Sequence, residues 1–119
     1  MRAPPTSHHP PMTTLQQARA LALALPDVEE RDHHGRASFR VGGRIFATVW
    51  DQQHLNVMVD EAGIRSYVAR DPEVYAEVWW GRRLAAVRVR LDRVSAGELG
   101  ELLADAWEGR ARRSSGAGG

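Results

Sequence analysis

Two adjacent glycines, Gly42 and Gly43, restrict the fold of this chain more than any other feature, because they separate two runs of residues that favour β-strands. The runs cover residues 38–41 and 44–50. A two-residue glycine turn between such runs predicts a tight β-hairpin. After a polar turn at 51–53, Leu55, Val57 and Val59 share one face of a further strand. We therefore expect a three-stranded meander.

Two segments outside the meander have helical patterns. Thr14 and Gln17 form a capping box in front of an apolar stripe with helical spacing, which runs to Pro26. Asp60 is placed to cap a short helix that ends before the Asp71-Pro72 step. The sequence thus predicts one helix before the meander and one after it.

Two strands and a helix complete the predicted order. Residues 75–80 are rich in β-branched and aromatic side chains, so we favour a strand although their spacing also fits a helical face. Residues 86–91 alternate between apolar side chains and arginine, which is typical of a half-buried strand. Ser95 and Glu98 form a capping box for the last helix, and Gly109 is a natural end for it. The order α-β-β-β-α-β-β-α predicts an α+β fold, a two-layer sandwich whose antiparallel sheet carries the helices on one face.

Length and composition indicate the class of protein. The chain has 119 residues, the size of one domain. Its low-complexity ends predict a disordered N-terminal tail at 1–12, an ordered domain at 13–110 and a disordered C-terminal tail at 111–119, with Met12 as a candidate for the true start. The chain has no cysteine, no signal-peptide pattern and no apolar run that could span a membrane. We therefore expect a cytoplasmic protein without membrane contact.

The densest group of residues that can carry chemistry includes Asp32, His33 and His34. A carboxylate and two imidazoles can bind zinc or iron, or act as a general acid and base. However, adjacent histidines in an extended chain point in opposite directions, and no third histidine ligand is evident. We favour the interpretation that these side chains bond to local backbone and shape a turn. The sequence also lacks a serine-nucleophile motif and a phosphate-binding glycine loop, so we expect no catalytic site, cofactor or metal.

Arginines gather at two predicted turns. The chain has 16 basic residues, all of them arginine, and 15 acidic residues, which leaves a formal net charge of +1. The arginines of interest are Arg40 and Arg44 at the first turn, Arg82 and Arg83 at the second, and Arg88 and Arg90 on the strand that follows. Guanidinium groups bind phosphate in a bidentate manner, so two such hairpins can straddle a duplex backbone. The alternative is that these arginines only keep a sheet edge soluble.

Four tryptophans leave a second function open. Trp107 belongs to a helical core stripe, whereas Trp50, Trp79 and Trp80 lie at strand ends. An aromatic ring at a strand end serves in the core, in an interface or as a stacking surface, and we expect the core for most of them. If the rings are exposed and clustered, they favour a protein-interaction or small-ligand-binding module that uses the tryptophan-rich sheet surface.

The order and spacing of several segments resemble the MmcQ/YjbR family over residues 13–110. The segments are Leu25–Glu30, His34-Gly35, Phe39–Ala47, Asp71–Glu73 and Val87–Asp92. The resemblance implies a fold similar to that of the bacterial frataxin homologue CyaY. It also implies a small cytoplasmic module that binds double-stranded DNA through two β-hairpin wings.

The family pattern can be carried over to this chain residue by residue. It places the first wing at 39–46, with Arg40 and Arg44 near its tip, and the second around 80–90. The segment 79–84 matches the family only loosely. Iron binding, which frataxins perform with an acidic helix, is not expected, because residues 14–25 contain no acidic side chain. The expectation is a non-enzymatic protein, a monomer or weak dimer, that binds double-stranded DNA with little sequence specificity.

Overall fold

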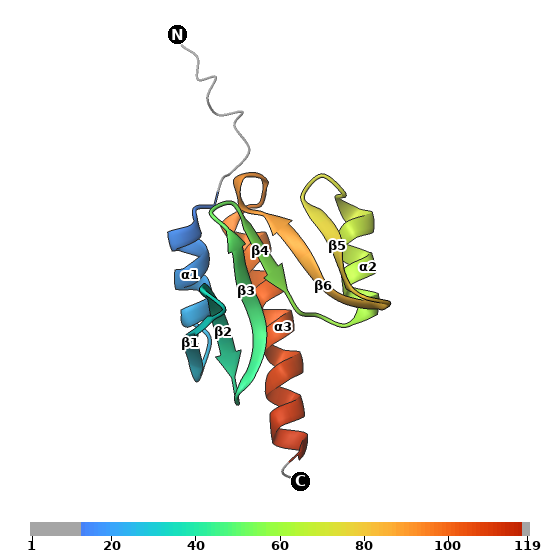
Figure 1. Ribbon diagram of the computed structural model, residues 1–119. Helices are drawn as coiled ribbons and strands as arrows, with labels where there is room; N and C mark the ends of the chain where they lie inside the picture. Colours follow the sequence, from blue (N-terminus) through green and yellow to red (C-terminus); the bar gives the residue numbers. More distant parts are fainter. Residues whose placement is uncertain (1–12, 118–119) are drawn as a thin grey trace.

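The computed structural model describes residues 13–117 and shows a six-stranded sheet with helices packed on one face (Figure 1). The strands are β1 Val28–His33, β2 Arg36–Val41, β3 Arg44–Asp51, β4 His54–Val57, β5 Tyr75–Trp80 and β6 Arg83–Arg90. The helices are α1 Leu15–Leu23, α2 Glu61–Arg70 and α3 Ala96–Ala117, and a short 3₁₀ turn, η2, covers Leu91–Arg93. The predicted α+β class and antiparallel sheet are confirmed. No helix in the described range is long and apolar enough to cross a membrane.

The sheet is antiparallel throughout, in the order β1-β2-β3-β4-β6-β5. β4 therefore lies between two hairpins, β2–β3 and β5–β6. Because β3 and β6 both run opposite to β4, the turns of the two hairpins lie at the same end of the sheet. In the first turn Gly42 and Gly43 have φ angles of 58° and 79°, a backbone conformation that residues other than glycine rarely adopt.

The core lies between the sheet and the helices. Alternate residues of the central strands point into it, and α1 contributes the buried Ala18 and Ala22. The largest fully buried side chains are Tyr75, Phe39, Phe46, Leu55, Ile64, Leu91, Leu99, Leu102 and Leu103. The opposite sheet face has no helix over it in the described part of the chain, so its side chains are available to a partner (Figure 1).

Side-chain caps fix the starts of the helices as the sequence predicts. The Thr14 hydroxyl accepts a hydrogen bond from Gln17 N, and the Gln17 side chain accepts one from Thr14 N. Asp60 Oδ1 accepts from Gly63 N at 2.8 Å at the start of α2. Ser95 and Glu98 form the corresponding pair at α3. These bonds satisfy amide groups that have no partner within the helix.

The structure adds one strand to the predicted order, because the polar stretch 28–33 forms β1. Its residues pair with β2 along its whole length, from Val28 opposite Val41 to His33 opposite Arg36. Only Val28 of this strand packs against the core. β1 therefore lacks the alternation of apolar and polar residues by which a strand is recognised in a sequence. Its charged side chains are typical of a strand at the edge of a sheet.

The predicted end of the last helix at Gly109 is wrong, because α3 continues to Ala117. A single glycine within a helix costs only about 1 kcal/mol. Arg110 offsets part of this cost, because its Nε donates a hydrogen bond to the Ile45 carbonyl at 3.0 Å. The predicted C-terminal tail thus overlaps the last turns of α3, whereas the predicted N-terminal tail at 1–12 lies outside the described residues.

Candidate nucleic-acid interface

The sheet face opposite the helices carries most of the arginines that the sequence singles out. Strand alternation places Arg36, Ser38 and Arg40 of β2 on this face, because Ala37, Phe39 and Val41 point the other way. On β6 the same alternation gives Arg88 and Arg90. We call this surface the arginine face. It consists of Arg36, Arg40, Arg88 and Arg90 with the side chains of β3 and β4 between them.

The arginine face is interrupted at the end where the two hairpins turn. β4 has only 4 residues, and its pairing with β6 ends at Val57 opposite Val87. The next residue, Met58, still donates its backbone N–H to Phe46 O at 2.9 Å. Beyond Met58, β3 and β6 continue toward their turns with no described strand between them. We call this gap the notch.

A hollow of about 670 Å³ lies over the notch and continues along the arginine face. Its lining combines arginines, histidines, two tryptophans and an apolar floor. The residues are His33, His34, Arg36, Arg44, Ile45, Thr48, Trp50, Asn56, Met58, Trp80, Arg83 and Arg110. The floor is stable because Met58 packs with Val78, Ala86 and Ile45 in a small cluster separate from the main core.

Two arginines in the middle of the face pack on Trp50. The guanidinium carbons of Arg36 and Arg88 lie 4.6 and 4.2 Å from its ring centroid. Arg88 Nε also donates to Asn56 Oδ1 at 2.9 Å, and Asn56 is 5% exposed. Arg36 Nε donates to the Trp50 carbonyl at 3.0 Å. These bonds hold both guanidinium groups in place, so the centre of the face is a rigid positive surface.

Acidic groups balance the charge toward the other edges of the face. Arg90 lies 3.4 Å from the carboxylate of Asp92. On the edge strand β1, Glu29 and Arg31 form a pair at 3.0 Å. Arg40 stands opposite Glu29 in the register, and its Nε donates to Ser38 Oγ at 3.3 Å. The positive charge of these arginines is therefore partly compensated.

The hairpin tips differ, because their arginines have no carboxylate partner among the described residues. Arg44 and Arg82 are exposed, and Arg83 lies over the ring of Trp80 with its guanidinium carbon 5.8 Å from the centroid. We call Arg44, Arg82 and Arg83 the tip arginines. The structure places them at the two predicted turns, and these turns lie at the same end of the sheet.

Sequence reasoning missed two exposed arginines, Arg36 on this surface and Arg112 in a cavity on the helix side. Arg36 lies on the same strand face as Ser38 and Arg40. Starting the predicted strand at residue 36 instead of 38 would have revealed it. Arg112 is exposed on the part of α3 that continues past Gly109, so the wrong helix end concealed it.

The expectation that most tryptophans belong to the core is wrong. Trp50, Trp79 and Trp80 are 40%, 47% and 51% exposed. They do not form one patch. Trp80 lines the hollow, whereas Trp79 donates to Glu77, whose carboxylate lies 3.9 Å from Arg65 of α2 on the helix side. Trp107 packs against the core as predicted, and its Nε1 donates to Pro26 O at 2.9 Å.

The Asp32–His34 segment shapes a turn, as the favoured interpretation has it. Asp32 Oδ2 accepts a hydrogen bond from Gly35 N at 3.2 Å, and His34 has a φ of 56° in the β1–β2 turn. This conformation brings the rings of His33 and His34 into edge contact at 4.6 Å, although an extended chain would separate them. Residues 13–117 contain no group of three or more possible ligands close enough to hold a metal ion.

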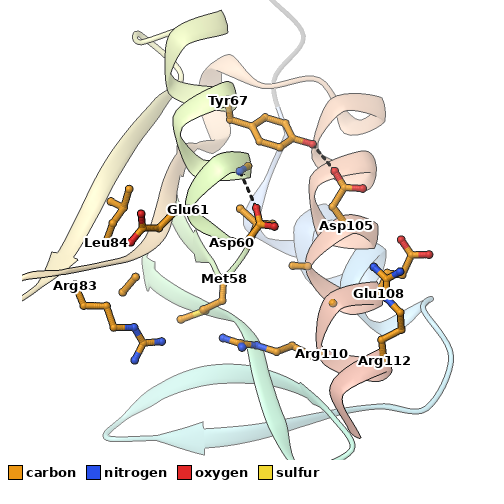
Figure 2. Close-up of a pocket in the computed structure, with 15 residues that line it drawn as sticks. Met58, Asp60, Glu61, Tyr67, Arg83, Leu84, Asp105, Glu108, Arg110 and Arg112 are labelled. Carbon is orange, nitrogen blue, oxygen red and sulfur yellow. Dashed lines mark hydrogen bonds between the residues drawn. The ribbon is translucent and has the colours of Figure 1, made fainter. Parts of the chain in front are cut away.

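A second cavity of about 690 Å³ lies on the helix side, between α2 and α3 (Figure 2). Tyr67 points across it from α2 and donates its hydroxyl to Asp105 Oδ2 at 2.8 Å. Burial and the hydrogen bond to Asp105 raise the pKa of Tyr67 well above its ordinary value. Asp60 and Glu108 also line this cavity. The carboxylates share the lining with three arginines, Arg83, Arg110 and Arg112, and two of the carboxylates already serve as a helix cap and a tyrosine partner.

Comparison with known proteins places the chain in a family. A search of curated protein sequences with this chain found no match. The crystal structure of the Deinococcus radiodurans protein DR2400, which carries a DUF419 domain, is similar with a TM-score of 0.69 and 22% identity over 90% of this chain and 91% of that one. At this identity the likeness shows the fold alone, and the expected likeness to CyaY stays a prediction. The family model YjbR matches residues 23–109, which is most of the chain. The protein therefore belongs to the YjbR family.

Proposed function

We propose that this protein binds double-stranded DNA through the arginine face and the tip arginines, without catalysing a reaction. The observation that carries the proposal is the arrangement of the tip arginines. Arg44 lies at one hairpin turn and Arg82 and Arg83 at the other, at the same end of the sheet and without a carboxylate partner in the described range.

The spacing of the hairpins fits a duplex backbone. β3 and β6 lie about 10 Å apart, at two strand spacings, where β4 runs between them, and toward the tips they continue without it. The major groove of B-DNA is about 12 Å wide. Arginines at the two tips, one hairpin on each side of β4, can bind phosphates of one duplex, where each guanidinium makes bidentate contacts.

Charge distribution explains how a nearly neutral protein can bind DNA. The acidic side chains that line the second cavity lie on the helix side, and Asp92 lies beside Arg90 at the opposite end from the tips. The net charge of +1 thus conceals a positive sheet face, while Arg83 at one tip also lines the second cavity. Contacts of this kind position phosphates and read little sequence, so we expect weak dependence on base sequence.

The test compares a tip variant with a matched control. Arg44→Ala with Arg82→Ala removes one positive charge from each tip. Arg65→Ala with Arg93→Ala removes the same charge from exposed positions away from the arginine face. Fluorescence anisotropy of a labelled duplex, across a salt series, measures the affinity and its salt slope.

Each lost phosphate contact reduces the slope of log K against log salt by about 0.9. We expect the tip variant to lose a slope of about 1.8 and the control to keep the wild-type slope. Equal slopes for the wild type and the tip variant, or absence of duplex binding by the wild type at low salt, would overturn the proposal.

The alternative, a protein-interaction module on the tryptophan-rich surface, has less support. Trp50 is covered by guanidinium groups, and Trp79 and Trp80 face opposite sides of the sheet. The exposed rings therefore provide no single apolar patch for a protein partner.

A further inference from the structure

We infer that the notch is a binding site for one nucleoside phosphate, either an unpaired nucleotide of a nucleic acid or a free nucleotide. The inference rests on the proposed function, because it assigns a ligand to part of the same surface. It goes beyond phosphate contacts, since it requires that a base enters the hollow between the hairpins.

The notch offers a wall for a base. Trp80, the last residue of β5, lines the hollow and leaves 51% of its surface exposed. Arg83 approaches the ring only to 5.8 Å, at the outer limit of a cation–π contact. Trp50 is unsuitable, because two guanidinium groups already lie within 4.6 Å of its ring centre. Trp80 is therefore the tryptophan in the hollow on which a base can stack.

The floor and rim suit the two parts of a nucleotide. Met58 and Ile45 form an apolar floor that belongs to a packed cluster, so the floor does not collapse into the space. Arg44 and Arg83 stand at the rim, one on each hairpin, where they can bind a phosphate attached to the base. The whole hollow, which includes the notch and also runs along the arginine face, has about 670 Å³, within the ordinary range for small-molecule sites.

The origin of the notch supports a site of this kind. β4 ends while β3 and β6 continue, so no described strand fills the gap between them. Arg110 of α3 also lines the hollow, and its Nε donates to the Ile45 carbonyl of β3 at 3.0 Å. A closed sheet would not present this depth.

Trp79 provides a matched control for Trp80. The two are neighbours with similar exposure, but Trp79 lies on the helix side, bonded to Glu77. We would measure the affinity of the wild type, Trp80→Ala and Trp79→Ala for a paired duplex, for the same duplex with one bulged adenine, and for free deoxyadenosine monophosphate. Anisotropy serves for the duplexes, and isothermal titration calorimetry, which needs no tryptophan signal, serves for the free nucleotide.

We expect the wild type to bind the bulged duplex at least about fivefold more tightly than the paired duplex, because stacking adds to the phosphate contacts. Trp80→Ala loses this gain and keeps its affinity for the paired duplex, whereas Trp79→Ala keeps both. Saturable binding of the nucleotide to the wild type and Trp79→Ala, but not to Trp80→Ala, identifies free nucleotides as a source of the ligand. A gain for the bulge without nucleotide binding assigns the site to nucleic acid alone.

The two failures are distinguishable. If the paired duplex binds with the expected salt slope but the bulge adds nothing and the nucleotide shows no saturable binding, the notch inference is overturned and the proposed function stands. The same holds if Trp79→Ala and Trp80→Ala lose the gain equally. If no duplex binds, the proposed function itself fails.

Discussion

The contact of Arg88 with Asn56 and Trp50 allows a sharp test of how the arginine face is built. Arg88→Leu keeps a long apolar side chain in place and removes the guanidinium group. Asn56, which is 5% exposed, then loses the donor to its Oδ1, now 2.9 Å away. The Trp50 ring loses the guanidinium group that lies 4.2 Å from its centroid.

The expected cost follows from these two contacts. A hydrogen bond to a charged group contributes about 1.5–3 kcal/mol, and a half-exposed cation–π contact contributes about 0.5–1 kcal/mol. We therefore expect Arg88→Leu to lower the free energy of unfolding by about 2–4 kcal/mol. Arg65→Leu, whose guanidinium lies 3.9 Å from Glu77 on the surface, should cost less than about 1 kcal/mol.

Urea unfolding, followed by tryptophan fluorescence and by circular dichroism, measures both variants. The double variant Arg88→Leu with Asn56→Leu should recover part of the loss, because replacing both partners leaves no buried amide oxygen without a donor. The reasoning is refuted if Arg88→Leu is no less stable than Arg65→Leu. It is also refuted if the double variant loses more unfolding free energy than the two single variants, Arg88→Leu and Asn56→Leu, lose together.

Three further predictions concern stability and use the same urea assay. The pKa of Tyr67 is raised from the ordinary 10.0, so its contribution to the free energy of unfolding is present below about pH 10 and is lost as the pH rises toward the folded-state pKa. Tyr67→Phe should therefore lose less stability than the wild type when the buffer is made alkaline. Equal alkaline losses would contradict this. Gly43→Val should lower the free energy of unfolding by about 1–2 kcal/mol, because φ is 79° at this position. The space around it is open, so only backbone strain opposes the change, and an unchanged urea midpoint would exclude that strain. Trp107→Phe should cost about 1 kcal/mol through the lost hydrogen bond to Pro26 O, and a neutral effect would show that this bond contributes nothing.

Local sequence patterns predicted much of the fold, because they act within a few residues. The Gly42-Gly43 turn and the Asp60 cap depend on neighbours in the chain, and both are where the sequence places them. β1 was missed because its stability comes from pairing with β2, and a single apolar residue, Val28, contacts the core. The end of α3 was missed because Arg110 bonds to Ile45, which is distant in the sequence.

The candidate site was predictable only in part. Alternation along β6 places Arg88 on the outer face, and the turn positions place Arg44 and Arg82 at the tips. The notch, in contrast, requires knowing that β4 pairs with β6 and ends at Val57. No local pattern specifies this long-range pairing. The exposure of Trp80 depends on the same pairing, because its ring lines the hollow over the gap that remains where β4 ends.

The central claim is that DNA contacts the tip arginines and not the helix side of the molecule. Because every basic side chain in this chain is an arginine, side-chain Nε–Hε signals in nuclear magnetic resonance spectra of ¹⁵N-labelled protein report on all of them. Titration with a short duplex at low salt should shift the signals of Arg44, Arg82 and Arg83 and leave those of Arg19 and Arg65 in place. Shifts confined to Arg19 and Arg65, or no shift at any of the five, would contradict the account.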